Sequence, residues 1–133
     1  MKPNLLGCSM GITKVTVIGA GTMGAGIAQI CAQAGWQTTL YDAYPEGLDR
    51  GMKRIDDFWD KGIARGKTTA EQKRQWSENL TAEQDLSRAV DKCDLVIEAV
   101  PEILELKQKI FREVEHYCSK QTIFATNTSS LSI

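Results

Sequence analysis

The sequence contains few of the residues from which metal centres and disulfide scaffolds are built. It has one histidine, His116, and four cysteines, at positions 8, 31, 93 and 118, which show no Cys-x-x-Cys spacing. Cys31 and Cys118 fall on helical patterns, where a cysteine most simply serves as a small buried apolar group. Neither a zinc site nor a disulfide framework is therefore indicated, and we expect no metal.

The sequence also lacks a membrane span, a targeting segment and an excess of charge of one sign. No apolar run approaches the ~20 residues that cross a bilayer. Residues 1–10 are too few and too polar for a signal peptide, and they lack the repeated arginines of a transit peptide. The 16 basic and 17 acidic side chains nearly balance, which gives no reason to expect a nucleic-acid or membrane partner. We therefore expect a cytoplasmic protein of one domain.

A glycine-rich turn between a predicted strand and a predicted helix is the most informative stretch. The β-branched residues of 13–18 predict a buried strand, which runs straight into Gly-Ala-Gly-Thr-Met-Gly at 19–24. A Gly-x-Gly-x-x-Gly sequence in this strand–turn–helix context is typical of a dinucleotide-binding site. The helix is predicted over 22–34 from apolar side chains three and four residues apart, namely Met23, Ile27, Ile30 and Ala34.

Each glycine of the turn has a physical role in such a site. Gly19 permits the sharp bend out of the strand, Gly21 leaves room for a pyrophosphate against the backbone, and Gly24 lets the helix pack close to the strand. Thr22 and Met23 begin the helix, where unpaired amides and the positive end of the helix dipole face the phosphates. We predict that these five residues bind the cofactor.

An acidic residue follows the next predicted strand, at 37–41. Asp42 comes 18 residues after Gly24, close to the spacing expected of a carboxylate that binds the adenosine ribose. An aspartate at this point can also be a turn or helix-cap residue, but the glycines upstream favour dinucleotide binding. The next residues include no arginine to meet a 2′-phosphate, which the carboxylate would also repel. The predicted cofactor is therefore NAD and not NADP.

The rest of the sequence alternates predicted helices and strands. A long helix begins near Pro45, and a short helical segment at 68–76 opens with Thr69-Ala-Glu-Gln72, which matches a capping box. Gly35 is placed to end the first helix in a left-handed conformation. The other predicted elements are strands near 80–82, 94–100 and 122–125, a short helix within 83–92, and a helix opened by Pro101 with core residues Ile103, Leu106, Ile110, Val114 and Tyr117.

This alternation predicts a Rossmann-type α/β fold, a doubly wound and mostly parallel sheet with helices on both faces. Ligands of such folds bind beyond the carboxyl ends of the strands. The glycine turn, Asp42 and the turns at 99–102 and 127–130 are then expected along one edge of the sheet.

The segment 45–76 is long for a crossover between two strands of such a sheet. A helix that extends past the sheet projects as an arm, and Arg65 and Lys67 lie near the expected tip. These two cations are candidates for a phosphate-rich substrate tail. An ordinary solvated face is the simpler interpretation of the same charges.

Three separated segments resemble one family. They are Ile18–Ala28, Asp94–Glu102 with its continuation to Lys107, and Ala125-Thr-Asn-Thr-Ser-Ser-Leu-Ser-Ile133. Together they resemble the amino-terminal domain of the 3-hydroxyacyl-CoA dehydrogenases, including the 3-hydroxybutyryl-CoA dehydrogenases, over nearly the whole chain. The resemblance implies reversible oxidation of an L-3-hydroxyacyl-CoA to the 3-ketoacyl-CoA by NAD, as in fatty-acid β-oxidation or butanoate metabolism.

The resemblance also implies roles for three later residues. Glu102 and Lys107 match positions near the nicotinamide half of the cofactor, and Ser129 matches a serine that contacts the reacting oxygen of the substrate and the cofactor. Without the resemblance, the simpler interpretation of Ser129 is a hydroxyl that bonds within a turn, and that of Glu102 is an acid at a helix N-terminus. Ile103 stands where the family often has asparagine, so the hydrogen bonding around Glu102 differs from the family pattern.

The family's catalytic His–Glu pair lies downstream of the serine-rich turn, outside this sequence, and so does its second, helical domain. His116 falls within a predicted helix at 111–117 without a matching motif, so we expect it on the surface. We therefore expect 1–133 to be an NAD-binding domain that binds NAD without turnover. The full enzyme is expected to take an acyl-CoA substrate and to form a homodimer through the other domain.

Two alternatives stay open at this point. A non-catalytic NAD-binding or structural protein of the same fold fits the sequence without the His–Glu pair equally well, and the reading frame beyond Ile133 would distinguish it. A different Rossmann dehydrogenase acting on a small hydroxy acid is disfavoured by the sequence at 127–133.

Overall fold

A computed structural model describes residues 13–100, 104–118 and 122–126, without the side chains of 104–107 and 126. Its centre is one five-stranded sheet in the order β3-β2-β1-β4-β5, and every neighbouring pair is parallel. The predicted doubly wound fold is confirmed. The strands are β1 (Lys14–Ile18), β2 (Gln37–Tyr41), β3 (Leu80–Glu83), β4 (Leu95–Glu98) and β5 (Ile123–Thr126).

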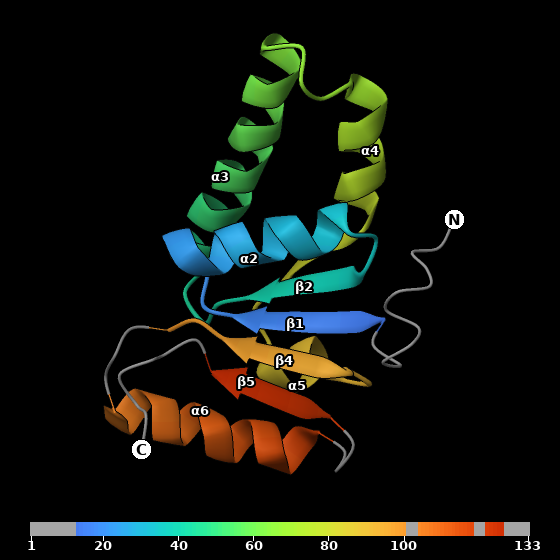
Figure 1. Cartoon of the computed structure of the whole chain (residues 1–133). Coiled ribbons are helices and arrows are strands. Elements are labelled where there is room, and N and C mark those ends of the chain that lie inside the picture. The colour runs from blue at the N-terminus through green and yellow to red at the C-terminus, as the bar shows by residue number, and fades with distance from the viewer. Residues whose placement is uncertain (1–12, 101–103, 119–121, 127–133) are drawn as a thin grey trace.

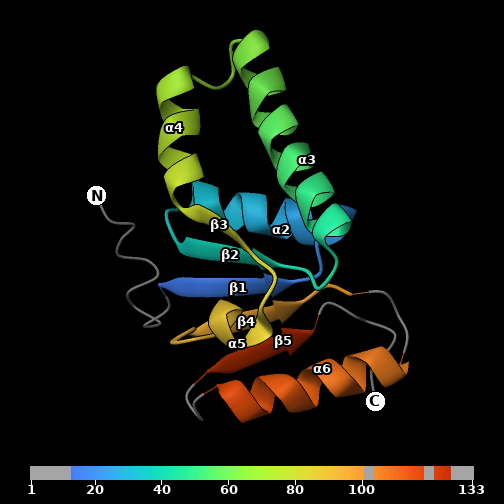
Figure 2. The same cartoon turned by 180° about the vertical axis from the view of Figure 1, so that it is seen from behind.

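Helices cover both faces of the sheet (Figures 1 and 2). One apolar layer joins Val15, Val17 and Leu40 of the sheet to α2 and α3, and the other joins Ile18 and Val96 to α5 and α6. No helix in the described part of the chain is long and apolar enough to cross a membrane. The helices are α2 (Thr22–Gln33), α3 (Pro45–Ala64), α4 (Ala70–Glu78), α5 (Leu86–Ala89) and α6 (Leu104–Tyr117).

The register of the sheet aligns the carboxyl ends of three strands. Ile18 of β1 pairs with Tyr41 of β2 on one side and with Glu98 of β4 on the other. The chain therefore leaves all three strands at one level, which places the glycine turn, Asp42 and Ala99 at the same edge, as predicted. The turn at 127–130 and Glu102, also predicted there, lie outside the described residues.

Helix α2 forms where the sequence predicts it, but it buries a different face. Met23 is 59% exposed and Ile30 is 65% exposed, so the predicted apolar stripe does not face the sheet. The close approach of α2 to β1 explains this difference, because it leaves space only for small side chains. The buried residues of the helix are Gly24, Ala25, Ala28, Cys31 and Ala32.

Helices α3 and α4 form a hairpin that rises away from the sheet, the arm that the sequence predicts (Figure 1). Trp59 of α3 is only 2% exposed and stacks at a tilt against Trp76 of α4, with ring centroids 5.6 Å apart. Its indole Nε1 donates a hydrogen bond of 2.9 Å to Oε1 of Gln33 at the end of α2. This contact fixes the hairpin to the body of the domain.

The two helices of the arm are also joined by charge and by a cap. Lys73 of α4 forms ion pairs with Asp56 and Asp60 of α3, at 2.8 and 2.7 Å. The predicted capping box is present, because Thr69 Oγ1 accepts from Gln72 N and Gln72 Oε1 accepts from Thr69 N, each at 3.0 Å. The arm is thus a defined structure and not a loose insertion.

Two further predictions concern the ends of helices. Gly35 has φ of 96° just after α2, which confirms the predicted left-handed end. In α6, Ile110 and Val114 are buried as predicted, but Tyr117 is 47% exposed because it lies in the last turn, beyond the apolar layer. The side chains of Ile103 and Leu106 lie outside the described part. His116 is on the exposed side of α6, as expected.

The close approach of α2 to β1 leads to a prediction about two neighbouring glycines. A Cβ added at Gly24 would lie 1.7 Å from the carbonyl oxygen of Gly19, whereas one added at Gly26 would meet no atom within 4 Å. Gly24→Ala is expected to lower the free energy of unfolding by about 3 kcal/mol or more. Gly26→Ala, the control, is expected to raise it by about 0.5–1 kcal/mol through its helix propensity. Urea unfolding measures both, and equal stability of the two variants would contradict this packing.

Candidate cofactor site

A cavity of about 1020 Å³ opens at the carboxyl ends of β1, β2 and β4. It is lined by the whole run from Ile18 to Met23, by the segment that follows β2, and by Ala99 and Val100 after β4. Residues of α3 and α6 complete the wall. The predicted dinucleotide site therefore coincides with a cavity at the expected edge of the sheet.

The three glycines of the turn have distinct surroundings. Gly19 has φ of 109°, and a Cβ there would lie 2.8 Å from the carbonyl oxygen of Ala99, so no larger residue fits. Gly24 is held against Gly19 by the packing of α2. Gly21 has no atom within 4 Å of the position of a Cβ. Packing inside the protein therefore accounts for Gly19 and Gly24, while Gly21 leaves open space beside the cavity.

The start of α2 is suited to an anion. Gly21 is the N-cap residue, it supplies no side-chain cap, and the first turn carries no acidic residue. The first N–H groups of a helix have no partner within the helix, and the helix dipole adds a partial positive charge there. A diphosphate can accept hydrogen bonds from N–H groups at such a helix start. The turn thus fits the diphosphate of a dinucleotide.

Asp42 is fixed at the edge of the same cavity by two backbone amides. Its Oδ2 accepts a hydrogen bond from Ala20 N, and its Oδ1 accepts one from Tyr44 N, both at 2.9 Å. A carboxylate oxygen can accept more than one hydrogen bond, so both oxygens can still accept from ribose hydroxyls. The acid predicted to bind the ribose therefore touches the turn predicted to bind the diphosphate.

The cavity is lined by both acidic and basic side chains. Its carboxylates are those of Asp42, Glu46 and Glu113, and its cations are Arg50 and Arg54 of α3 and Lys109 of α6. Burial, together with the carboxylates of Glu113, Asp42 and Asp85, raises the pKa of the Tyr41 phenol above its usual value. Tyr41 therefore stays neutral in the physiological range.

Several predicted site residues lie away from this cavity or outside the described part. Glu102 and Ser129 are not among the described residues, and Lys107 is described only as part of the backbone of α6. Arg65 caps the end of α3, and Lys67 follows it in the exposed turn at the tip of the arm. Neither of these two cations lines a described cavity. Their roles remain predictions.

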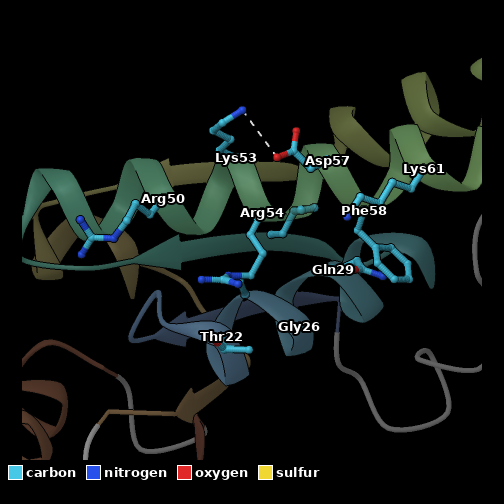
Figure 3. A pocket seen from close by; sticks show the side chains of 11 residues that line it. Thr22, Gly26, Gln29, Arg50, Lys53, Arg54, Asp57, Phe58 and Lys61 are labelled. Atoms are coloured by element: carbon cyan, nitrogen blue, oxygen red, sulfur yellow. Dashed lines mark ion pairs between the residues drawn. The ribbon is translucent and has the colours of Figure 1, made fainter.

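Sequence reasoning missed the two arginines of α3. A second cavity, of about 580 Å³, lies between α2 and α3 (Figure 3), and it shares Thr22, Arg50 and Arg54 with the first. Lys53 and Lys61 also line this groove. The spacing of four residues puts Arg50 and Arg54 on one face of a helix, but only the packing of α3 shows which face meets the cavity.

Comparison with known proteins agrees with this site. Residues 14–133 match the family described as the 3-hydroxyacyl-CoA dehydrogenase, NAD binding domain. A 3-hydroxyadipyl-CoA dehydrogenase of Escherichia coli is 43% identical over 122 residues, which are 92% of this chain and 26% of that protein. A probable 3-hydroxybutyryl-CoA dehydrogenase of Bacillus subtilis is 37% identical over 124 residues, 93% of this chain and 43% of that protein.

Solved structures show the same similarity in three dimensions. The crystal structure of the 3-hydroxybutyryl-CoA dehydrogenase from Escherichia coli matches with a TM-score of 0.85 and 41% identity, over 90% of this chain and 25% of that one. The chain thus spans between a quarter and a half of the length of these relatives. The match over residues 14–133, joined to the glycine turn and its fixed acid, shows that the chain belongs to the 3-hydroxyacyl-CoA dehydrogenase family, whose NAD-binding domain it contains.

Proposed function

We propose that this chain is the NAD-binding part of an oxidoreductase that interconverts L-3-hydroxyacyl-CoA and 3-ketoacyl-CoA, as in fatty-acid β-oxidation. The observation that carries the proposal is the open backbone at Gly21, next to a carboxylate that is hydrogen-bonded to the same turn. A related structure, a crystal structure of (S)-3-hydroxybutyryl-CoA dehydrogenase from Ralstonia eutropha, has a TM-score of 0.85 and 31% identity. That enzyme is an (S)-3-hydroxybutyryl-CoA dehydrogenase, which supports both the acyl-CoA substrate and the handedness proposed here.

The residues of this chain have separate tasks in that reaction. NAD, when bound, accepts the hydride of the hydroxyacyl group and returns it in the reverse direction. The amides at the start of α2 hold the diphosphate, and Asp42 holds the ribose, so the position of the dinucleotide is fixed at two points. Ser129 is proposed to donate a hydrogen bond to the substrate oxygen as negative charge develops there.

The remaining chemistry is proposed to come from residues outside 1–133. A general base is needed to remove the hydroxyl proton, and in the family a His–Glu pair provides it. The described cavity contains no histidine, since His116 lies on the exposed side of α6 and is not part of the lining. We therefore propose that the complete enzyme adds a second domain that closes the site and joins two copies of the protein.

The groove between α2 and α3 supports an acyl-CoA as the substrate. Coenzyme A carries three phosphate groups, and the groove is lined by Lys53, Arg54 and Lys61 together with the exposed ring of Phe58. It adjoins the cofactor cavity, with which it shares Thr22, Arg50 and Arg54. Arg65 and Lys67 extend the same positive charge to the tip of the arm.

The role of Gly21 can be tested without disturbing the fold. Gly21 has an extended conformation, with φ of −74° and ψ of −169°, and open space around its Cβ position. Gly21→Val is therefore expected to unfold at nearly the wild-type temperature but to bind NADH at least about tenfold more weakly, because the side chain occupies the place of the diphosphate. Titration of NADH fluorescence and thermal unfolding measure the two effects. Wild-type affinity in the folded variant would refute the diphosphate site.

Whether residues 1–133 catalyse the reaction without the rest of the enzyme is also testable. The isolated chain is expected to bind NADH and to reduce acetoacetyl-CoA no faster than a preparation of the Gly21→Val variant purified in parallel. Consumption of NADH measures the rate, and the parallel preparation controls for contaminating dehydrogenase. Turnover by the wild-type chain well above that control would show that residues 1–133 contain the catalytic base.

The two cations at the tip of the arm give a third test. In a version that includes the second domain, replacing Arg65 and Lys67 by alanine is expected to raise KM for acetoacetyl-CoA by about two- to fivefold, as for exposed charge pairs. KM for NADH and kcat are expected to stay unchanged. Arg88→Ala, which removes an exposed cation far from the arm, is the control. An unaltered KM for the acyl-CoA would exclude both residues from its binding site.

A further inference from the structure

Two arginines of α3 reach the cofactor cavity beside the glycine turn. Arg50 and Arg54 line both the cofactor cavity and the groove between α2 and α3. Figure 3 shows Arg54 extending from α3 toward the first turn of α2, where Thr22 lies, and Arg50 extending beyond the start of that helix. Both guanidinium groups therefore lie on the side of the cavity where the amides of α2 begin.

The position of these arginines is set by a backbone contact with the turn itself. A Cβ added at Gly51 would lie 2.6 Å from the carbonyl oxygen of Ala20, the residue between the first two glycines of the motif. Helix α3 thus touches the glycine turn at Gly51, one residue after Arg50 and three residues before Arg54. The two side chains therefore begin on either side of a fixed contact between the helix and the turn.

Neither arginine is neutralised within the described part of the chain. The ion pairs there engage Lys53, Lys73, Arg74 and Arg88, and no hydrogen bond or ion pair involves Arg50 or Arg54. Two cations four residues apart on one face of a helix repel each other. An anion between them and the start of α2 would relieve this repulsion.

We propose that Arg54, assisted by Arg50, forms a cationic clamp on the outer oxygens of the NAD diphosphate. The amides of α2 hold the inner oxygens, and the guanidinium of Arg54 closes the diphosphate from the side of α3. Arginine suits this role because its planar fork donates two hydrogen bonds to one phosphate group. Arg54 is then a binding residue for the cofactor, while Lys53 and Lys61 are left to the substrate.

The test compares Arg54→Ala with a neighbour of equal charge on the same helix. Lys53 lines the groove but not the cofactor cavity, and it pairs with Asp57 at 3.5 Å (Figure 3), so Lys53→Ala removes the same charge without touching the cofactor cavity. Calorimetric titration of the chain with NADH and with ADP-ribose is expected to give about three- to tenfold weaker binding for Arg54→Ala. Lys53→Ala is expected to bind both ligands as the wild type does.

A second variant, the salt dependence of binding and a folding control complete the test. Arg54→Lys is expected to keep part of the affinity, because it retains the charge but loses the fork. The loss in Arg54→Ala is expected to shrink at about 1 M salt, where the Debye length is roughly 3 Å. A thermal unfolding scan confirms that the variants are folded.

The inference depends on NAD binding in this cavity, and the outcomes distinguish a failure of the cofactor site from a failure of the clamp. Failure of the wild-type chain to bind NADH would overturn the cofactor site and the clamp together. Wild-type affinity of Arg54→Ala for NADH and ADP-ribose would overturn the clamp alone. The clamp would also be overturned if Lys53→Ala caused an equal loss, or if Arg54→Ala weakened the binding of coenzyme A and left that of NADH unchanged.

Discussion

The contact between Gly24 and the carbonyl of Gly19 is the constraint on which the site depends. It brings the backbone of α2 onto the end of β1, so the helix can bury only small side chains against the sheet. The same contact places the first turn of the helix at the cavity, which Gly21, Thr22 and Met23 line. A looser helix would pack larger residues, but its amides would not meet a diphosphate at the strand end.

The glycine turn is held from three directions by segments distant in the sequence. Asp42, which follows β2, accepts from Ala20 N, while Ala99 after β4 fills the space beside Gly19. Gly51 of α3 packs against the carbonyl of Ala20. A turn fixed in this way is preorganised, so little conformational entropy is lost when a ligand binds to it. The acid that is predicted to bind the ribose is therefore also part of the scaffold of the diphosphate site.

The strands, the glycine turn and Asp42 were predictable because each follows from local chemistry: β-branched runs, a motif in its strand–turn–helix context, and a spacing. The buried face of α2 was not, because hydrophobicity favours Met23 and Ile30 whereas the short distance to β1 admits only small residues. Tyr117 was wrongly predicted to be a core residue for a similar reason, since a periodic pattern does not show where the apolar layer ends. Arg50 and Arg54 were missed because their direction depends on how α3 rotates about its contact at Gly51.

Those arginines bear on the choice of cofactor, since cations near a ribose often indicate a 2′-phosphate. Here the carboxylate of Asp42 is fixed at the cavity edge by Ala20 N and Tyr44 N, so it cannot turn away from a phosphate on the ribose. Burial is the main cause of the raised pKa of Tyr41, and the carboxylates of Glu113, Asp42 and Asp85 add to it. The positive charge lies instead beside the start of α2, where every dinucleotide carries its diphosphate. The fixed carboxylate at the ribose thus favours NAD over NADP, while the start of α2 still binds an anion.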